Sequence, residues 1–523
     1  MFDFTRRDFL KSLFAGTAFA SFGGMRLFGA DEKKIVVPKL RIGVVSDVHI
    51  KLTANTTNVW EKTLRWYDAQ GVDVVLVAGD IADTAQLEQL KKFSATWYKV
   101  FPDDKGSGGR HVEKFFIQGN HDYVGWRYGV NTEEKRKERF ETSIMKDIKD
   151  AWDVCFHEEW QGIYKKVIKG YTFIGAHWPH HTKIGEYMAA HKSEIDPNLP
   201  FFYTQHPHPK NTCHGPWAWG HDNGASTKTF TEFPNAIVFT GHSHNSISDE
   251  ACIWQDSFTS IGTASLRYIG HRRGRANGGE PGPLELKSPG IGNADQHGML
   301  VSVFDDHINI KRRSFAFDEP LGPDWTLPLP LGEKKPYARA HRAQMARRKL
   351  PAFAEGAAEQ IVIKEDPATA KLPAHITVSF PSAVSGGMVF DYEIKAEIGD
   401  DHKEHEAIGK PIYDVQPRRW TRRIFAPRYF SPLSKRPETA TCFFGYTEIP
   451  LGENIRFAVT PMDAFGNRGK TIYSKVSKFT KPAAKAAEPA KPAAPAKPAE
   501  PAKPAEPAKP AEPAKPAEKP AAK

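Results

Sequence analysis

Cysteine is scarce in this sequence. The 523 residues contain four cysteines, at positions 155, 213, 252 and 442. Their wide spacing excludes the closely paired C-x-x-C pattern of common zinc and redox sites. Three fully paired disulfide connectivities remain open from the sequence alone.

Long apolar runs are also missing. Beyond residue 30 no apolar run reaches the 18 residues or so that a membrane-spanning helix needs. The one N-terminal candidate, residues 12–30, is short and interrupted by glycine. We therefore expect no stable membrane span.

Charge is weak over most of the chain. The net charge is +10, but residues 481–523 carry +4 of it and residues 1–30 carry +2, which leaves +4 for residues 31–480. Such a small excess over 450 residues requires no polyanionic partner, so nucleic acid is disfavoured as a partner.

The C-terminal segment lacks aromatic residues. Residues 481–523 hold 12 of the 40 prolines in A-K-P-A-E-P repeats. Such a tract buries too little surface to fold, so it is expected to be a low-complexity, semi-extended spacer. The remaining length exceeds one hydrophobic core and predicts two or three domains.

The first thirty residues predict a targeting segment. The sequence T-R-R-D-F-L-K at residues 5–11 precedes the short apolar stretch. It resembles a bacterial twin-arginine export signal, although that pattern prefers serine where Thr5 stands. Cleavage could follow Ala20 or Ala30. The resemblance implies a soluble mature protein in the periplasm or another extracytoplasmic compartment, and because such substrates are exported already folded, we favour free or buried thiols over a disulfide framework.

From residue 40 onward, short apolar runs alternate with helical stretches. The pattern predicts strands at 41–46, 72–78, 113–118, 171–175, 200–204 and 236–240, with helices at 57–70 and around 132–149. This alternation favours α/β layers built on a mainly parallel sheet, with further β-structure at 253–263 and 299–312.

Five short motifs follow predicted apolar strands directly. They are D-V-H at 47–49, G-D-I-A-D at 79–83, G-N-H-D at 119–122, H-P at 206–207 and G-H-S-H at 241–244. An open α/β sheet collects its functional groups at the carboxyl ends of its strands, so these side chains are expected to meet.

The motifs supply seven candidate metal ligands: Asp47, His49, Asp80, Asn120, His206, His242 and His244. Carboxylates, imidazoles and an amide oxygen suit borderline-hard divalent ions, and seven of them exceed one tetrahedral site. Two metals fit better, with Asp80 as a bridge between ions roughly 3.5–4 Å apart. The glycines before Asp80, Asn120 and His242 permit sharp turns.

In order and residue type, these motifs resemble those of the calcineurin-like metallophosphoesterases. The resemblance covers residues 40–315 and implies a four-layer α/β/β/α sandwich. It places Asp47, His49, Asp80 and His244 on one metal, and Asp80, Asn120, His206 and His242 on the other, the metals being Mn, Fe or Zn. It also places His121 near the leaving oxygen, oriented by Asp83. Asp83 stands where the purple acid branch of the family has tyrosine, which argues against that branch.

His206 is the least specific of these assignments. Other candidates for the isolated histidine are His177, His180, His181, His208 and His214, and only its spacing and the preceding apolar strand favour His206. The loop that follows also contains Trp217, Trp219 and His221, which either line a substrate pocket or pack the loop.

The rest of the chain changes character twice. Residues 316–359 are expected to form a basic and Pro-rich connector. For its run of Lys and Arg at 334–349, we favour a solvent-exposed helix over an anion-binding arm. Residues 360–480 alternate like strands of an all-β sandwich. Their end, R-F-A-V-T-P-M-D-A-F-G-N at 456–467, resembles the last hairpin of a fibronectin type III domain. Arginines at 418, 419, 422, 423 and 428 surround Trp420 and Phe425, where cation–π packing and surface charge are favoured over glycan or nucleic-acid binding.

Together these patterns predict an exported two-metal phosphoesterase that hydrolyses a phosphomonoester or phosphodiester by metal-bound hydroxide. Its domains would be a signal segment (1–30), the metallophosphoesterase domain (40–315), the connector (316–359), the fibronectin type III-like sandwich (360–480) and the tail (481–523). Contact with the cell envelope would be made through the last two. The alternatives are a catalytically inactive envelope binding protein and an exported nuclease.

Overall fold

The structure is a computed structural model, and it describes residues 37–53, 55–214, 220–269, 295–369, 373–384, 389–398, 421–431 and 433–480. The expected export signal at 1–30 and the spacer at 481–523 lie outside these residues. Among the described residues, no helix is both long and apolar enough to cross a membrane.

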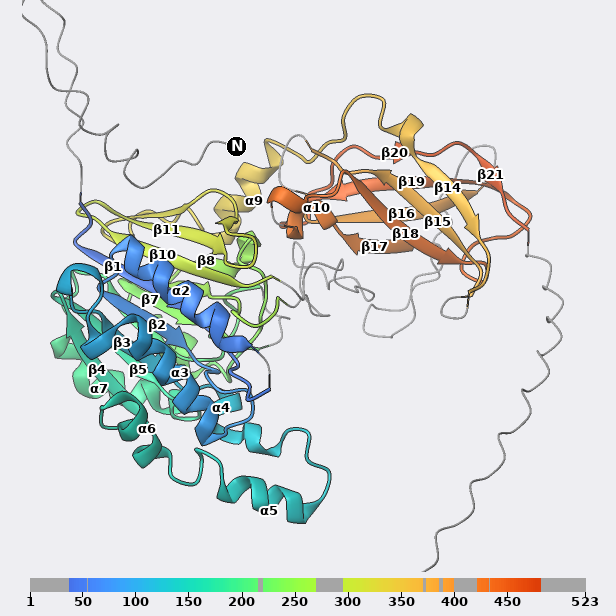
Figure 1. The fold of residues 1–523 in the computed structure, drawn as a ribbon. Helices are drawn as coiled ribbons and strands as arrows, with labels where there is room; N and C mark the ends of the chain where they lie inside the picture. The colour runs from blue at the N-terminus through green and yellow to red at the C-terminus, as the bar shows by residue number, and fades with distance from the viewer. Residues whose placement is uncertain are drawn as a thin grey trace, which may run out of the picture.

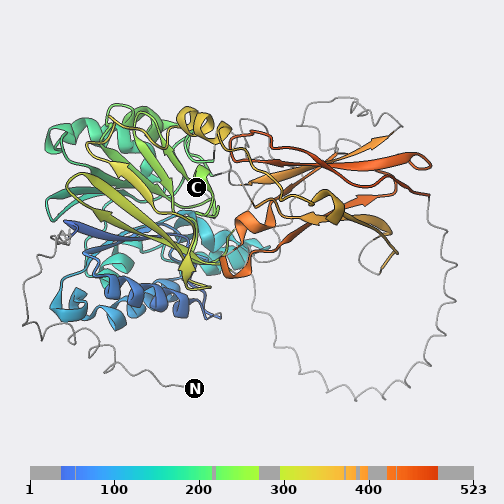
Figure 2. The same ribbon diagram turned by 90° about the horizontal axis from the view of Figure 1, so that it is seen from above.

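The N-terminal part contains two mixed sheets (Figures 1 and 2). The first has the order β12-β11-β10-β1-β2-β3, with β13 paired to β11. Its strands are β1 (Leu40–Val45), β2 (Val74–Ala78), β3 (Glu113–Ile117), β10 (His297–Val303), β11 (His307–Ser314), β12 (Glu319–Pro320) and β13 (Trp325–Pro328).

The second sheet has the order β4-β5-β6-β7-β9-β8. Its strands are β4 (Ile163–Ile168), β5 (Tyr171–Ala176), β6 (Phe201–Thr204), β7 (Ala236–Thr240), β8 (Ile253–Gln255) and β9 (Thr259–Gly262). The expectation of a mainly parallel sheet with further β-structure is therefore met in part. Parallel pairing is confined to β1-β2-β3 and β5-β6-β7-β9, while the described strands outside these runs pair antiparallel. Four of these antiparallel pairs, β4-β5, β8-β9, β10-β11 and β11-β12, join strands that follow each other in sequence through short connections, whereas β10 pairs with β1 across most of the domain.

The two sheets share one core, and helices cover their other faces. The helices are α2 (Thr56–Gln70), α3 (Leu87–Val100), α4 (Asn120–Val124), α5 (Glu133–Glu141), α6 (Ile148–Phe156), α7 (Ile184–His191) and α8 (Ala225–Phe230). Side chains of α2, α3 and α6 pack with the first sheet, and those of α7 and α8 with the second.

Strand β2 shows how the sequence encodes this layering. Val74 and Leu76 belong to the core between the sheets, whereas Val75 and Val77 belong to the core beneath α2 and α3. Successive side chains of a strand point to opposite faces, so a strand covered on both faces must be apolar at every position. The sequence V-V-L-V-A meets that requirement.

The C-terminal part contains two smaller sheets, of order β14-β15-β18 and β17-β16-β19-β20, with β21 paired to β19. The strands are β14 (Val362–Asp366), β15 (His375–Pro381), β16 (Asp391–Ile398), β17 (Thr421–Phe425), β18 (Thr439–Gly445), β19 (Asn454–Met462), β20 (Ile472–Tyr473) and β21 (Ser477–Lys478). Alternate residues of β15, such as Ile376 and Val378, share a core with Ile394 of β16 and Val459 of β19. These strands therefore form β-sheet regions added to the α/β part.

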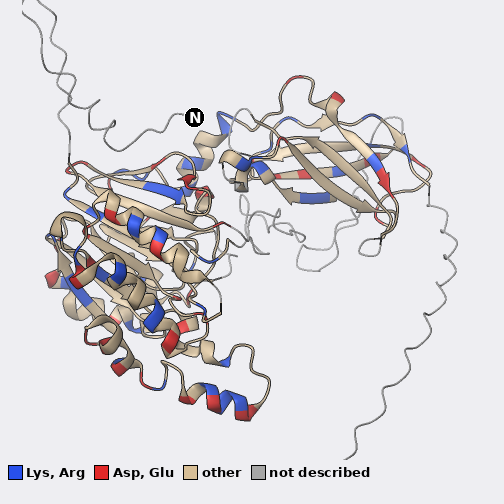
Figure 3. Cartoon of the chain, viewed as in Figure 1, with Lys and Arg blue, Asp and Glu red and all other residues tan. Residues whose placement is uncertain are grey.

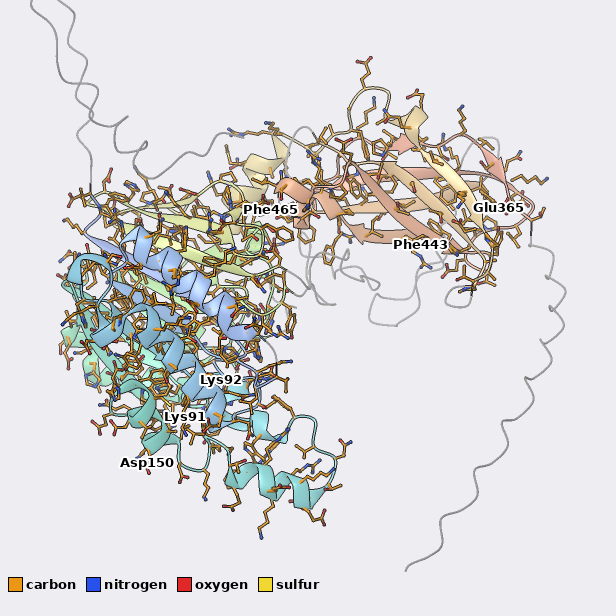
Figure 4. The ribbon with its side chains drawn as sticks, viewed as in Figure 1. Lys91, Lys92, Asp150, Glu365, Phe443 and Phe465 are labelled. Carbon is orange, nitrogen blue, oxygen red and sulfur yellow. The ribbon has the colours of Figure 1, made fainter. Side chains whose placement is uncertain are left out.

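Two short helices lie where the two parts meet: α9 (Arg339–Arg347) and α10 (Pro427–Phe430) (Figure 1). The basic run at 334–349 does contain a helix, but it is more than a solvated one. Arg342 forms an ion pair with Glu250 of the α/β part, and its guanidinium lies 5.2 Å from the ring of Phe465, labelled in Figure 4. Helix α9 therefore contacts both parts of the chain.

Two arginines of the predicted C-terminal cluster are paired with carboxylates. Arg422 pairs with Glu448, and Arg423 with Asp391 at 2.5 Å. Residues 418–420 of that cluster lie outside the described part. The charges of these two arginines are therefore compensated within the C-terminal sheets.

Candidate metal centre

The motif residues lie at the carboxyl ends of neighbouring parallel strands. Asp47 and His49 follow β1, and Asp80 follows β2. Asn120 begins α4 just after β3, His206 follows β6, and His242 and His244 follow β7. Because the two sheets pack against each other, the two sets of strand ends face one site.

Two groups of potential metal ligands share Asp80. Asp47, His49, Asp80 and His244 form one group, and Asp80, His206 and His242 form the other, with the ligand atoms of each group within 4.8 Å of one another. These are the two sets that the motifs predict, apart from Asn120, whose amide oxygen is considered below. The shared carboxylate is the feature expected of a bridging ligand.

Asp80 reaches both groups through one oxygen. Its Oδ2 lies 3.6 Å from Nε2 of His49 and 3.1 Å from Nε2 of His206. On the first side, Oδ1 of Asp47 lies 2.8 Å from Nε2 of His244, and the Nε2 atoms of His49 and His244 are 3.2 Å apart. Four ligand atoms therefore converge on one small volume, and Asp80 connects it to a second.

Each of three imidazoles is fixed by its other ring nitrogen. Nδ1 of His206 is 2.8 Å from the carbonyl oxygen of Ala78, and Nδ1 of His244 is 3.1 Å from that of Tyr268. Nδ1 of His49 is 3.3 Å from Oδ1 of Asp83. A partner at Nδ1 fixes the tautomer and aims Nε2 at the ion, which is the usual arrangement of metal-binding histidines.

The carboxylates are oriented in the same way. Oδ2 of Asp47 accepts from the Ser46 hydroxyl at 2.5 Å and from the His242 N–H at 3.0 Å. Oδ1 of Asp80 accepts from the His121 N–H at 2.8 Å. The other oxygen of each carboxylate, Oδ1 of Asp47 and Oδ2 of Asp80, is left to face the histidines.

Asn120 is arranged to offer its amide oxygen. Its Nδ2 donates to the Tyr128 hydroxyl at 3.1 Å, while its buried Oδ1 has no hydrogen-bond partner within the described residues. A buried carbonyl oxygen without a partner costs free energy, and binding a cation would satisfy this oxygen.

The motif glycines make room for the ligands. A Cβ added at Gly119 would lie 2.1 Å from Oδ1 of Asp80, and one at Gly241 would lie 2.4 Å from Oδ2 of Asp47. Of the three motif glycines, only Gly79 has a positive φ, of 93°, and a Cβ there would also lie 2.4 Å from Nδ1 of His206. The expected sharp turn thus explains Gly79 in part, whereas Gly119 and Gly241 are needed because a carboxylate lies against them.

Five of the predicted ligands have positive φ angles. They are Asp47 (50°), His49 (48°), Asp80 (53°), His242 (67°) and His244 (55°). The left-handed region costs a non-glycine residue on the order of 1 kcal/mol or more, and such strain concentrates at functional sites. The shared conformation shows that the fold holds these side chains in place against a local preference.

The electrostatics of the centre call for positive charge. Burial would raise the pKa of Asp47, but His244 holds that pKa well below its usual value. Burial likewise opposes the lowered pKa of Asp80, which His206 maintains. Conversely, burial would lower the pKa of His206, yet Asp80 and Asp47 raise it to about 9. Without a cation the carboxylates are therefore neutralised by imidazolium protons, so the donor set fits divalent metal ions that would displace those protons.

His121 lies beside the first group, but Asp83 contacts it differently from the expectation. Nδ1 of His121 is 2.6 Å from the main-chain carbonyl oxygen of Asp83, whereas the Asp83 carboxylate faces His49 and lies 3.4 Å from Nζ of Lys51. Burial and His49 lower the pKa of His121, against the effect of Asp80. Asp83 thus holds His121 through its backbone and His49 through its side chain.

The structure places the competing histidines elsewhere. His177 accepts from the Gln118 N–H at 3.0 Å, and His181 packs 5.0 Å from the ring of Trp178. His208 contacts Thr240 and Ser243, and His214 contacts Cys252. Of the candidates for the isolated histidine, His206 is the one grouped with Asp80. Trp217 and Trp219 lie outside the described residues.

Three residues of the site carried no assignment from the sequence. Asp122, the last residue of G-N-H-D, accepts from the N–H groups of Gly119, Ile81 and Ala82 and so ties the β2 loop to the β3 loop. The ring of Tyr128 lies 4.7 Å from His121, and that of Tyr268 lies 4.2 Å from His244. Asp122 was visible in its motif, but no local pattern marks the tyrosines, since only the fold brings them here.

Comparison with known families agrees with this geometry. Residues 40–246 match the calcineurin-like phosphoesterase family. The matched domain is less than half of the chain, begins at β1 and ends just after the G-H-S-H motif. Residues 40–246 are thus similar to calcineurin-like phosphoesterase domains, and they contain the candidate metal-binding residues.

Solved structures give weaker similarities. A dimetal phosphatase from Danio rerio aligns at 11% identity over 55% of this chain and 98% of its own, with a TM-score of 0.33. GAP50, the anchor in the inner membrane complex of Plasmodium, aligns at 12% over 56% and 90%, with a TM-score of 0.35. Vps29 of Entamoeba histolytica, complexed with Zn²⁺, aligns at 11% over 55% and 99%, with a TM-score of 0.26. No match was found among curated proteins.

Proposed function

We propose that the chain is an exported phosphoesterase that uses two divalent metal ions, Mn, Fe or Zn, to hydrolyse a phosphomonoester or phosphodiester. The observation that carries this proposal is the position of Asp80, whose Oδ2 lies between His49 and His206 and joins two groups of ligands. In this assignment the first ion takes Asp47, His49, Asp80 and His244, and the second takes Asp80, Asn120, His206 and His242.

Two bound ions would activate water and neutralise the charge of the phosphate. The chain's own contribution is orientation. Hydrogen bonds at Nδ1 hold the imidazoles of His206 and His244, and Tyr128 turns the Asn120 amide. His121, fixed by the Asp83 carbonyl, would donate a proton to the departing oxygen or stabilise its charge.

The same proposal extends to the architecture. The core shared by the two large sheets, with helix-covered outer faces, supports a four-layer α/β/β/α sandwich over residues 40–315. The packing of a three-stranded and a five-stranded C-terminal sheet around one core supports a fibronectin type III-like sandwich over 360–480. Export by the twin-arginine route to the periplasm, and envelope contact through the C-terminal region and tail, rest on the sequence patterns alone.

Hydrolysis of a chromogenic phosphomonoester and its diester counterpart by metal-analysed protein tests the function. Asp80→Asn should abolish turnover and reduce bound metal below two equivalents, because one carboxylate serves both ions. Asp305→Asn is the matched control, since that aspartate is exposed and paired with Lys39 away from the centre. Full activity of Asp80→Asn would contradict the two-metal assignment.

The two alternatives predict other results. A catalytically inactive envelope binding protein would bind metal yet hydrolyse neither ester. An exported nuclease would cleave DNA or RNA better than small diesters, but the basic residues of helix α5 are interspersed with glutamates (Figure 3), and residues 31–480 carry a net charge of only +4. The nuclease therefore ranks below the phosphoesterase, and the ester assay decides between the phosphoesterase and the binding protein.

A further inference from the structure

A second cluster of metal-ligand side chains lies outside the centre described above. His214, Asp249 and Cys252 are buried, with exposed fractions of 1%, 0% and 0%. Each can place one ligand atom within 4.8 Å of the others. None of the three belongs to the motifs that form the phosphoesterase centre.

One distance within the cluster matches that between two ligands of a small ion, since Sγ of Cys252 is 3.4 Å from Nε2 of His214. Oδ2 of Asp249 lies 3.5 Å from Nδ1, the other ring nitrogen of His214, and an imidazole gives one ion only one of its two nitrogens, so the bound on all three ligand atoms together is the 4.8 Å given above. Ligands held tetrahedrally at zinc bond lengths of about 2.0–2.3 Å are separated from one another by roughly 3.3–3.8 Å. The Cys252 thiol donates to the Ser246 carbonyl oxygen at 2.9 Å, and metal binding would replace the proton of this hydrogen bond.

The chemistry of the donors differs from that of the phosphoesterase centre. A thiolate is a soft ligand and selects zinc-like ions over magnesium or calcium, and an imidazole and a carboxylate are its usual partners. The cluster is also too deeply buried to present the thiol to a substrate. These features favour a structural ion over a catalytic group.

We propose that His214, Asp249 and Cys252 bind one further divalent ion, of which zinc fits the donors best, and that this ion has a structural role. The cluster contacts two functional regions of the chain. Cys252 contacts the Ser246 carbonyl, just after the G-H-S-H ligands. The hydroxyl of Tyr429, in α10, donates to Oδ1 of Asp249 at 3.4 Å. The same hydroxyl accepts from the Glu250 N–H at 3.1 Å.

An ion here would therefore fasten the loop that carries His242 and His244 to the C-terminal β-sheets. Asp249 and Cys252 lie at the start and the end of the short helix η6 (Glu250–Cys252, with Asp249 as its N-cap), while His214 lies in the segment after β6. Helices α9 and α10 meet the α/β part in this region (Figure 1).

Cobalt substitution of the full chain tests the proposal, because the phosphoesterase centre contains no sulfur ligand. Titration of metal-free protein with Co²⁺ should produce a thiolate-to-cobalt charge-transfer band in the near ultraviolet. Cys252→Ser should lose the band, and Asp249→Asn should bind this cobalt ion at least tenfold more weakly. Cys442→Ser, in the C-terminal sheets, and Asp80→Asn should keep the band. The Asp80 variant separates this site from the proposed function.

Absence of the band in the unaltered protein, or its persistence in Cys252→Ser, would overturn the proposal. If Cys252→Ser fails to fold, zinc X-ray absorption on the unaltered chain decides the matter. Its spectrum should contain a zinc–sulfur shell near 2.3 Å, and a shell of nitrogen and oxygen alone would refute the site.

Discussion

Replacing Gly119 by alanine gives a direct test of the metal centre. The added Cβ would lie 2.1 Å from Oδ1 of Asp80 and 2.6 Å from its main-chain nitrogen, whereas carbon atoms of this kind do not approach closer than 3.0 Å. The Asp80 carboxylate must therefore move by nearly 1 Å. The backbone itself is not strained, because φ at Gly119 is −101°.

A displacement of about 1 Å in a catalytic group costs on the order of 10²-fold in rate. Because Asp80 serves both groups of ligands, we expect Gly119→Ala to lower kcat by roughly that factor and to weaken the binding of both ions. The assays are kcat on a chromogenic phosphate ester, metal content after dialysis, and thermal unfolding.

Gly445→Ala is the matched control. Its added Cβ would meet only the carboxylate end of Glu448, at 3.2 Å, far from the centre along the chain. Gly119→Ala with two tightly bound ions and kcat within a few-fold of the unaltered protein would refute the reasoning.

Three further predictions concern single side chains. His121→Ala should keep both ions and lower kcat by roughly 10²–10⁴-fold, most on alkyl phosphates and least on nitrophenyl esters, whose leaving group needs no proton; equal losses on both, together with lost metal, would make His121 a ligand. Asp83→Asn should weaken metal affinity about 10–100-fold through His49 but leave the leaving-group dependence unchanged, since the carbonyl that holds His121 remains; a changed leaving-group dependence would contradict this. Burial would raise the pKa of Asp295, but His297, the Ser314 hydroxyl and a backbone N–H hold this pKa below its usual value. The Asp295 carboxylate therefore stabilises the fold above about pH 4, and this stabilisation is lost as the pH falls through the pKa of the folded state. The stability difference between the unaltered protein and Asp295→Asn, measured by urea unfolding, should therefore shrink in acid, and a pH-independent difference would count against it.

The motifs allowed the candidate site to be predicted from the sequence because ligand type and strand context are both local. A residue such as Asp80 follows an apolar run directly, and the carboxyl ends of parallel strands meet. The sequence also predicts free or buried thiols, and the structure shows all four cysteines in buried positions.

What the sequence could not supply depends on tertiary contacts. The need for glycine at Gly241 comes from an aspartate nearly two hundred residues earlier in the chain. Asp83 holds His121 through its main-chain carbonyl oxygen, and the direction of that carbonyl cannot be predicted from a sequence motif. The cluster of His214, Asp249 and Cys252 was invisible for the same reason, because its members are dispersed and belong to no motif.

The environment of Glu250 has a mechanical consequence. This one carboxylate contacts Arg312 of β11, Trp325 of β13 and Arg342 of α9, and its backbone N–H donates to Tyr429 of α10. Through these contacts, a displacement of the C-terminal sheets would reach the turn just beyond the G-H-S-H loop.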